Sequence, residues 1–195
     1  MARQSGVARE FFVRSAVEVA PELIGCTLLF EGVGGRIVEV EAYDQSEPAS
    51  HSHRGETPRT RTMFGPAGAV YVYRSYGLHW CMNVVCEDNR ASAVLIRALE
   101  PLEGIAAMQT RRGRSNRREL CSGPGRLCEA LGVSRSQDGD SVLTKPFAFA
   151  TGLDVVDVIA SRRIGISKAV DLPWRFSERG SRFLSRPVKE APTSP

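Results

Sequence analysis

The stretch that organises this chain is RIVEVEAY, residues 36–43. Apolar and polar residues alternate along it, which predicts a single β-strand whose successive side chains point to opposite faces. One face then carries Ile37, Glu39, Glu41 and Tyr43. Two carboxylates and a phenol would therefore point the same way, and glutamates on a strand face are most often solvated.

The paired glutamates raise the question of glycosidic chemistry. Glycoside hydrolases use two carboxylates, one on each side of the bond that is cleaved. Residues two apart on one strand lie roughly 6.5–7 Å apart with parallel side chains, so Glu39 and Glu41 cannot easily flank a sugar. From the residues alone, a carbohydrate-active hydrolase and a solvated pair both remain open.

The segments around this strand predict an α+β domain. Amphipathic spacing predicts a helix over residues 5–24 that ends near Pro21. A polar loop follows the central strand at residues 44–62. Runs of β-prone residues predict further strands at 26–30, 69–76, 78–86 and 93–98. The last three are separated by short turns, as in an antiparallel meander.

The second half of the chain predicts helices packed against a mostly antiparallel sheet. We expect Pro101 to open a helix that runs to residue 112. A second helix is expected over residues 126–131, after the turn Gly123-Pro124-Gly125. Residues 159–166 look like a strand.

The size and charge of the chain limit its class. Its 195 residues suffice for one core, and we expect a single domain over residues 1–185 with a disordered Pro-rich tail at 186–195. The chain carries 26 Lys+Arg and 22 Asp+Glu, a net charge of +4, and only three of the basic residues are lysines. Guanidinium groups suit phosphates, so this balance predicts an anionic partner.

Membrane, secretory and metal-binding classes are disfavoured. No apolar run approaches the roughly 20 residues that cross a bilayer, and Arg9 and Glu10 interrupt any secretion signal. We expect no membrane contact and a cytoplasmic location, nucleoid-associated in a bacterium or nuclear in a eukaryote. The cysteines at positions 26, 81, 86, 121 and 128 include no Cys-x-x-Cys pair, which favours reduced thiols. We expect neither a metal nor a cofactor.

The polar loop at residues 44–62 is rich in imidazoles and guanidiniums. It contains His51, His53, Arg54, Arg59 and Arg61. Such a group is compatible with a solvated loop and equally with one that touches phosphates. A second basic run, at residues 111–118, leaves the same two interpretations open.

Aromatic residues gather in the first hairpin of the meander. Tyr71, Tyr73, Tyr76 and Trp80 fall within ten residues. Alternation puts Tyr71 and Tyr73 on one face, with Tyr76 at the strand end. Core packing is the simplest explanation, and a stacking surface for a base with a wedge at the hairpin tip is the alternative. Arg97, inside an apolar strand, needs a carboxylate partner, for which Glu41 is a candidate.

Five motifs then occur in order along the chain. They are RIVEVEAY (36–43), HSHRGETPRTRTMFG (51–65), YVYRSYGLHWCMN (71–83), LIRALEPLEG (95–104) and LCSGPGRLCEALG (120–132). Together they resemble the alkyladenine (3-methyladenine) DNA glycosylases, the methylpurine glycosylases of base-excision repair. The similarity runs from about residue 21 to 133 with short gaps, and continues more loosely through 163–166 to the end of the chain. It implies a single α+β domain with a protruding β-hairpin that enters the minor groove of DNA.

The resemblance implies how the bond is broken. Glu41 would be the general base that deprotonates the attacking water, with Arg97 and the backbone carbonyl of Ile164 holding that water. No general acid for a neutral leaving base can be assigned. A lyase would need an amine to form a Schiff base, and all three lysines lie outside the motifs, so we expect a monofunctional, water-using enzyme.

The resemblance also implies how damaged DNA is held. The base pocket would be formed by Tyr43, His51 and Tyr73. Tyr76 would fill the gap left in the duplex, and Asn83 would crowd the 2-amino group of guanine. The expected DNA contacts of the loop are Arg54, Arg59 and Arg61.

We therefore expect a monomer that excises 3-methyladenine, 7-methylguanine, hypoxanthine and ethenoadenine from double-stranded DNA and leaves an abasic site. Two departures from the family pattern bear on the site. The loop between Tyr43 and His51 is one residue shorter than in mammalian members, and Arg74 and Ser75 stand where apolar residues are expected. A non-catalytic nucleic-acid-binding module would also explain the arginines and aromatics, but not a carboxylate beside a buried arginine.

Overall fold

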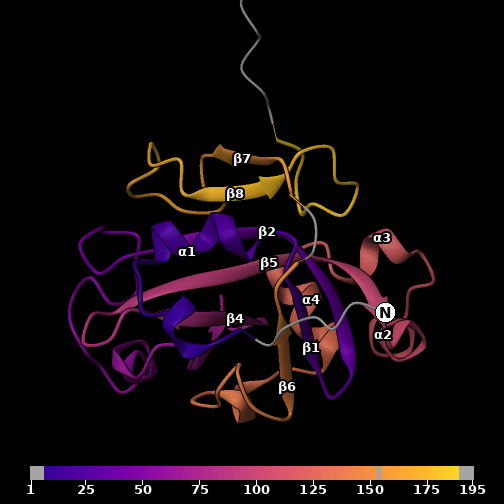
Figure 1. Ribbon diagram of the computed structural model, residues 1–195, viewed down its shortest axis with the longest axis horizontal. Coiled ribbons are helices and arrows are strands. Elements are labelled where there is room, and N and C mark those ends of the chain that lie inside the picture. Colours follow the sequence, from indigo (N-terminus) through magenta and orange to yellow (C-terminus); the bar gives the residue numbers. More distant parts are fainter. Residues whose placement is uncertain (1–6, 153–154, 189–195) are drawn as a thin grey trace, which may run out of the picture.

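The central strand of the sheet is β2, Val33–Tyr43, which contains the alternating stretch RIVEVEAY (Figure 1). Along one side it pairs with β5, Ser92–Glu103. Along the other side, β1, Thr27–Phe30, covers the first half of β2, and β8, Arg175–Glu178, covers the second half. The segment 39–41 therefore has a strand on each side, and both of its glutamates are buried.

The computed structural model describes residues 7–152 and 155–188, and every strand pairing among them is antiparallel. The main path of the sheet runs β3-β4-β5-β2-β1-β6, and β7 pairs with β8 beside it. The other strands are β3 (Val70–Ser75), β4 (His79–Cys86), β6 (Phe147–Ala150) and β7 (Val158–Ser161). The helices are α1 (Ala16–Leu23), α2 (Ile105–Arg112), α3 (Arg117–Leu120) and α4 (Pro124–Leu131). The predicted α+β class with a mostly antiparallel sheet is confirmed.

The core lies between the sheet and helices α1 and α4. Its largest fully buried side chains include Phe12, Leu23, Ile37, Met82 and Leu127. Helix α1 begins after Ser15, whose hydroxyl accepts from the backbone N–H of Glu18 while the Glu18 carboxylate accepts from Ser15 in return. The helix is shorter than predicted, and it continues through Pro21 to Leu23 although a proline has no N–H to donate to the carbonyl four residues earlier.

The boundary between β5 and α2 differs from the sequence prediction. Pro101 does not open a helix, because β5 continues past it to Glu103 and α2 begins only after Gly104. This extension is possible because Gly35 lies opposite Pro101, where a Cβ would come within 1.9 Å of the Glu100 carbonyl oxygen. The close approach of the two backbones requires glycine there.

The C-terminal part also differs. Of the predicted strand 159–166, only residues 159–161 lie in a strand, β7, and β6 and β8 were not predicted. Helix α4 begins at Pro124 rather than at residue 126, as expected for a proline in the first turn. Of the predicted tail, 189–195 lie outside the described residues, and the carbonyl of Arg186 accepts a hydrogen bond from Arg175.

Strands β3 and β4 form a hairpin whose turn projects into solvent. Tyr76 and Gly77 both have positive φ angles, of 50° and 69°, and the Leu78 N–H donates to the Ser75 carbonyl. Two successive residues in this region, closed by such a hydrogen bond, match a type I′ turn, for which glycine at the second position is well suited. The turn presents Tyr76 with 88% of its surface exposed.

Candidate active site

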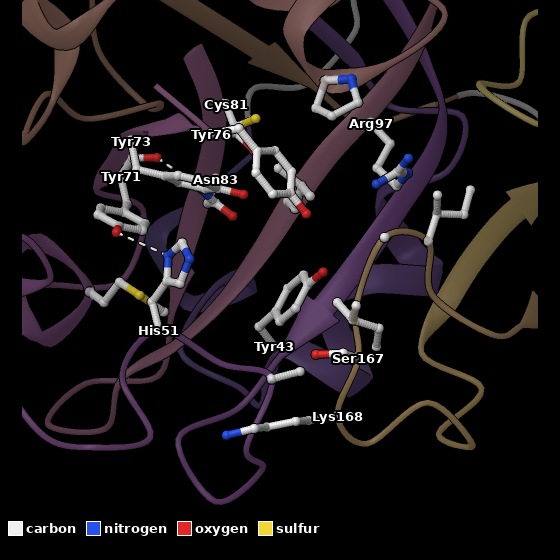
Figure 2. A pocket seen from close by; sticks show the side chains of 18 of the residues that line it. Tyr43, His51, Tyr71, Tyr73, Tyr76, Cys81, Asn83, Arg97, Ser167 and Lys168 are labelled. Carbon is white, nitrogen blue, oxygen red and sulfur yellow. Dashed lines mark hydrogen bonds between the residues drawn. The ribbon is translucent and has the colours of Figure 1, made fainter. Parts of the chain in front are cut away.

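A cavity of about 560 Å³ opens between the β3–β4 hairpin, the end of β2 and the segment after β7. Its walls include Tyr43, His51, Tyr71, Tyr73, Asn83, Arg97 and Ile164, together with the base of Tyr76. Figure 2 shows His51, Tyr71 and Tyr73 on one side, with Tyr43 across from them and Arg97 farther along the opposite wall. The structure thus brings these residues, which the sequence had singled out, together with Arg59 around one cavity, in a volume typical of a small-molecule site.

Both glutamates of β2 are fully buried, so the interpretation as a solvated pair was wrong. Arg97 lies between them: its Nε is 2.9 Å from Glu39 Oε1, and its Nη1 is 3.2 Å from Glu41 Oε2. The arginine is itself only 7% exposed. Buried charges of this kind are stable only when they are paired and hydrogen-bonded, which the contact of Arg97 with both carboxylates provides.

The Glu41 carboxylate lies behind the wall formed by Tyr43, Arg97 and Ile164. Its Oε2 accepts from the Tyr43 hydroxyl at 2.8 Å, and its Oε1 accepts from the Ile164 N–H at 2.7 Å. The contact of Ile164 shown by the structure is therefore made by its amide, whereas the water-holding role expected for its carbonyl stays a prediction. A carboxylate offers about four lone-pair directions. Among the described residues, Oε1 accepts only from Ile164, which leaves one direction for a further donor.

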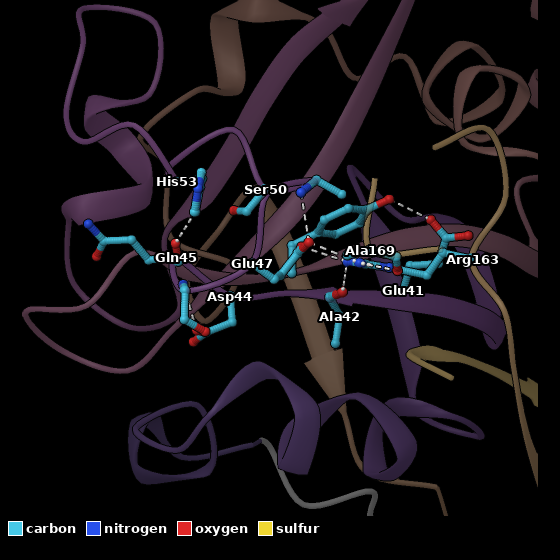
Figure 3. Close-up of polar contacts among 12 residues, drawn as sticks. Glu41, Ala42, Asp44, Gln45, Glu47, Ser50, His53, Arg163 and Ala169 are labelled. Carbon is cyan, nitrogen blue, oxygen red and sulfur yellow. Dashed lines mark hydrogen bonds and ion pairs between the residues drawn. The ribbon is translucent and has the colours of Figure 1, made fainter. Parts of the chain in front are cut away.

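Burial also affects the phenol of Tyr43. It raises the pKa of Tyr43 above its ordinary value, and the neighbouring Glu41 charge raises it further. The phenol therefore remains a hydrogen-bond donor to Glu41. The Arg163 guanidinium lies 4.6 Å from the Tyr43 ring centroid, a cation–π contact, and it is fixed by the Glu47 carboxylate and the Ala42 carbonyl (Figure 3). Arg163 and Glu47 were not recognised as a pair because they are 116 residues apart.

The second carboxylate, Glu39, has its own set of donors. Its Oε1 accepts from Arg97, from Arg175 at 2.9 Å and from the Ser185 hydroxyl at 2.7 Å, and its Oε2 accepts from the Ser185 N–H. Burial acts to raise the pKa of Glu39, but the charges of Arg97 and Arg175 and the Ser185 hydrogen bonds outweigh it and hold the pKa below its ordinary value. Arg175 and Ser185 were not predicted as site residues.

The opposite wall consists of aromatic rings. The His51 ring meets the Tyr73 ring edge to face at 4.5 Å between centroids, and Tyr71 stacks on Tyr73 at 5.6 Å. His51 Nδ1 lies 3.3 Å from the Tyr71 hydroxyl. Although the His51 side chain is exposed toward the cavity, surrounding protein and then the charge of Arg59 lower its pKa to about 4. The imidazole is therefore neutral at physiological pH.

Asn83 closes the inner end of this wall. Its Nδ2 donates to the Tyr71 carbonyl at 3.1 Å, and the residue is 5% exposed. This hydrogen bond turns the amide oxygen of Asn83 away from the Tyr71 backbone. Asn83 faces the same cavity as His51, and the role that the resemblance implies for it stays a prediction.

The loop arginines differ in position. Arg59 lies 5.7 Å from the Tyr73 ring centroid and within 3.4 Å of His51 Nε2, at the mouth of the cavity. Arg61 pairs with Glu56, and Arg54 is exposed. The second basic run is largely engaged within the fold: Arg111 donates to carbonyls at the end of α4, and Arg117 donates to the Pro101 carbonyl.

Lys168 also lines the cavity (Figure 2), although the sequence placed it outside every motif. It follows the segment of Ile164, where the resemblance is looser and no motif was assigned. Cys81 is a second unpredicted wall residue, and burial raises the pKa of its thiol. All five cysteines are free and buried. Among residues 7–152 and 155–188, no group of three or more His, Cys, Asp or Glu side chains could hold a metal ion.

A carboxylate behind a ring-lined cavity, next to a hairpin that presents an exposed tyrosine, is compatible with an enzyme that acts on a nucleobase outside the stack. The comparison with protein families agrees. Residues 10–182 match the family described as "Methylpurine-DNA glycosylase (MPG)", and the chain belongs to this family of DNA glycosylases. No helix in the described part of the chain has the length and apolar character needed to span a bilayer.

Individual relatives are similar over almost their whole length. A protein of Nitrobacter winogradskyi is 59% identical over 186 residues, covering 95% of this chain and 89% of its own. One of Nitrosospira multiformis is 57% identical and one of Agrobacterium fabrum 51%, each over 180 residues that cover 92% of this chain. These matches cover 93% and 92% of the two relatives. All three bear the name "Putative 3-methyladenine DNA glycosylase".

Proposed function

We propose that this protein is a monofunctional DNA glycosylase that extrudes alkylated or deaminated purines from duplex DNA and hydrolyses the N-glycosidic bond. Its substrates would include 3-methyladenine, 7-methylguanine, hypoxanthine and ethenoadenine. The observation that carries the proposal is the Glu41 carboxylate, which is fully buried directly behind an aromatic cavity. The product is an abasic site, and the protein acts as a monomer.

In this mechanism Glu41 is the general base. A water that donates to the open lone pair of Oε1 loses a proton to Glu41 as its oxygen bonds to C1′ of the sugar. The bond from C1′ to the base breaks, and its electron pair leaves with the base. The sugar acquires oxocarbenium character in the transition state, so the nearby carboxylate also stabilises developing positive charge. Arg97 and Ile164 restrict the carboxylate through the contacts described above.

The cavity supports selection of alkylated purines, which carry a positive charge. Tyr43 on one side and His51 with Tyr73 on the other offer faces and edges for an extruded ring, and such stacking contributes about 1–3 kcal/mol per base. An N3- or N7-alkylated purine already carries positive charge and leaves without protonation. Asn83 lines the same cavity, and in this proposal it would crowd the 2-amino group of guanine, as the family resemblance implies, and discourage excision of the normal base.

Duplex DNA is bound from the side of the hairpin. Tyr76 is the exposed group that would fill the gap left by the extruded nucleotide, an exchange that offsets part of the few kcal/mol needed for extrusion. Arg59 at the cavity mouth, with Arg54 and Arg61 on the same loop, would contact phosphates. Lys168 is the one amine among the cavity residues, and we assign it to the same phosphate-facing rim.

The test is excision from a duplex that contains a single hypoxanthine or ethenoadenine, in buffer without added metal, followed by treatment with alkali. Strand scission only after alkali supports a monofunctional glycosylase, whereas scission before alkali would show lyase activity. Glu41→Gln keeps the shape of the side chain but removes the base, so it should abolish excision and retain lesion binding. Salt-sensitive binding without scission by the unaltered protein would instead favour a binding module.

A further inference from the structure

We propose that Ser185, together with Glu39, positions Arg97 for the reaction, so that the segment after β8 is part of the catalytic apparatus. Neither residue contacts the cavity, and both act through Arg97, which does. This inference rests on the proposed function, because it assumes that Glu41 is the base. It adds to the residues of the cavity wall two residues that lie behind that wall.

The three residues form a closed ring of hydrogen bonds. Arg97 Nε donates to Glu39 Oε1 at 2.9 Å, and Arg97 Nη2 donates to the Ser185 hydroxyl at 3.2 Å. That hydroxyl donates in turn to Glu39 Oε1 at 2.7 Å, and the Ser185 N–H donates to Glu39 Oε2. Two of the three guanidinium nitrogens of Arg97 are thereby committed, and only Nη1 meets Glu41.

This division of donors determines what Arg97 can do at Glu41. An arginine that is free to rotate forms two parallel hydrogen bonds with a carboxylate. Such a bidentate pair with Glu41 would occupy both carboxylate oxygens and compete with a water for Oε1. Because Glu39 and Ser185 hold the other nitrogens, Arg97 contacts Glu41 through one nitrogen and leaves Oε1 to Ile164 and a further donor.

The segment that carries Ser185 is held in place by a second arginine. Arg175 in β8 donates its Nε to Glu39 Oε1 and its Nη2 to the Arg186 carbonyl, next to Ser185. Two arginines and two glutamates therefore balance in charge inside the protein. Among the described residues, the Ser185 hydroxyl is the one uncharged side chain that links Arg97 to Glu39. A substitution at Ser185 can therefore change the orientation of Arg97 without changing the charge of the cluster.

The experiment measures single-turnover excision of hypoxanthine from duplex DNA by the full chain, together with the dissociation constant for the same DNA and the thermal midpoint. Ser185→Ala should lower the single-turnover rate roughly tenfold and Glu39→Gln roughly a hundredfold, each with an unchanged dissociation constant. Ser185→Thr keeps the hydroxyl and should remain within about threefold of the unaltered protein.

Ser177→Ala is the matched control. Ser177 lies opposite Glu39 in the β2–β8 pairing, is fully buried, and its hydroxyl has no hydrogen-bond partner among the described residues. Its replacement should leave the rate unchanged. A lowered thermal midpoint with an unchanged rate for Ser185→Ala would show a purely structural role and overturn the proposal. An equal loss of the single-turnover rate in the Ser185→Ala and Ser185→Thr variants would also overturn the proposal.

The two proposals fail in different ways. If the unaltered protein does not excise the lesion, the proposed function is wrong. If it does, and Glu41→Gln is inactive while Ser185→Ala retains the full rate, only the positioning role is wrong. Should Glu39→Gln fail to fold, as removal of a buried charge can cause, the comparison of the alanine and threonine variants at Ser185 still decides.

Discussion

The backbone N–H of Ile164 donates a 2.7 Å hydrogen bond to Glu41 Oε1, joining two residues that are 123 positions apart. A hydrogen bond between an amide and an ionised carboxylate is shorter and stronger than one between neutral groups. It fixes one oxygen of Glu41, while the Tyr43 hydroxyl fixes the other. The carboxylate therefore has a defined orientation before any substrate is bound.

The Tyr43 hydroxyl should matter separately from its ring. We expect Tyr43→Phe to slow single-turnover excision roughly tenfold, because Glu41 loses a donor while the stacking face is retained. The dissociation constant for lesion-containing DNA should change less than the rate. Tyr71→Phe removes a hydroxyl that contacts His51 rather than Glu41, and should slow excision less than Tyr43→Phe does. Equal losses in both variants would contradict a specific role for the Tyr43 hydroxyl.

Tyr76 is exposed, so its replacement tests DNA binding without disturbing the core. Tyr76→Ala should weaken binding of a lesion in duplex DNA more than binding of the same lesion in a single strand, since only the duplex leaves a gap to be filled. Leu102→Ala, at an exposed apolar position near the far end of β5, is a control that should change neither. Fluorescence anisotropy with the four combinations of variant and DNA measures this, and parallel losses on both DNAs would argue against a wedge.

His51 should titrate well below an ordinary histidine. Its pKa of about 4 lies below the usual 6.5 because burial, and secondarily the Arg59 charge, disfavour the imidazolium. As the pH falls from 6.5 toward 4, the unfolded chain takes up this proton before the folded one does. His51 therefore lowers the free energy of unfolding over that window. Arg59→Gln removes the repulsive charge and should raise the pKa of His51, measured by NMR titration of the imidazole; an unchanged value would show that Arg59 exerts no such effect.

Two arginines adjacent in sequence offer a test of the buried ion pair that lies against the Tyr43 ring. Arg163 is buried and paired with Glu47, whereas Arg162 forms an exposed pair with Asp171. Arg163→Leu should lower the free energy of unfolding by about 3–5 kcal/mol, because it leaves a carboxylate uncompensated in the interior. Arg162→Leu should produce no measurable change. Urea unfolding followed by circular dichroism compares the two, and similar midpoints would contradict the buried-pair interpretation.

The sequence predicted the parts of the fold that depend on local pattern. Strict alternation identified β2, and runs of β-prone residues identified the meander of β3, β4 and β5, because both signals are properties of each strand by itself. It missed β8, whose four residues carry little pattern and become a strand by pairing with the second half of β2. It also ended β5 too early, because the tolerance of Pro101 depends on Gly35 in another strand.

The site was predicted unevenly for the same reason. Side chains with unusual chemistry, such as Arg97 in an apolar strand, could be recognised from their neighbours in sequence. The burial of Glu39 could not, because glutamates in alternating strands are usually exposed and its donors come from Arg175 and Ser185, over 130 residues away. The hydrogen bond from the Ile164 amide to Glu41 could not be predicted either, because every residue except proline has a backbone N–H.

The first half of β2 pairs with β1 and its second half pairs with β8, which lies far later in the sequence. The surroundings of β2 are therefore completed in two stages during synthesis. By the time the chain has emerged through β5, the strand carrying both glutamates can already pair with β1 and β5. Arg175 and Ser185, which also donate to Glu39, and the Ile164 amide that fixes Glu41 belong to residues 164–185, which emerge more than sixty residues later. A chain arrested between these points would hold most of its core but would lack these donors, so the surroundings of both glutamates are complete only after β8 and Ser185 have emerged.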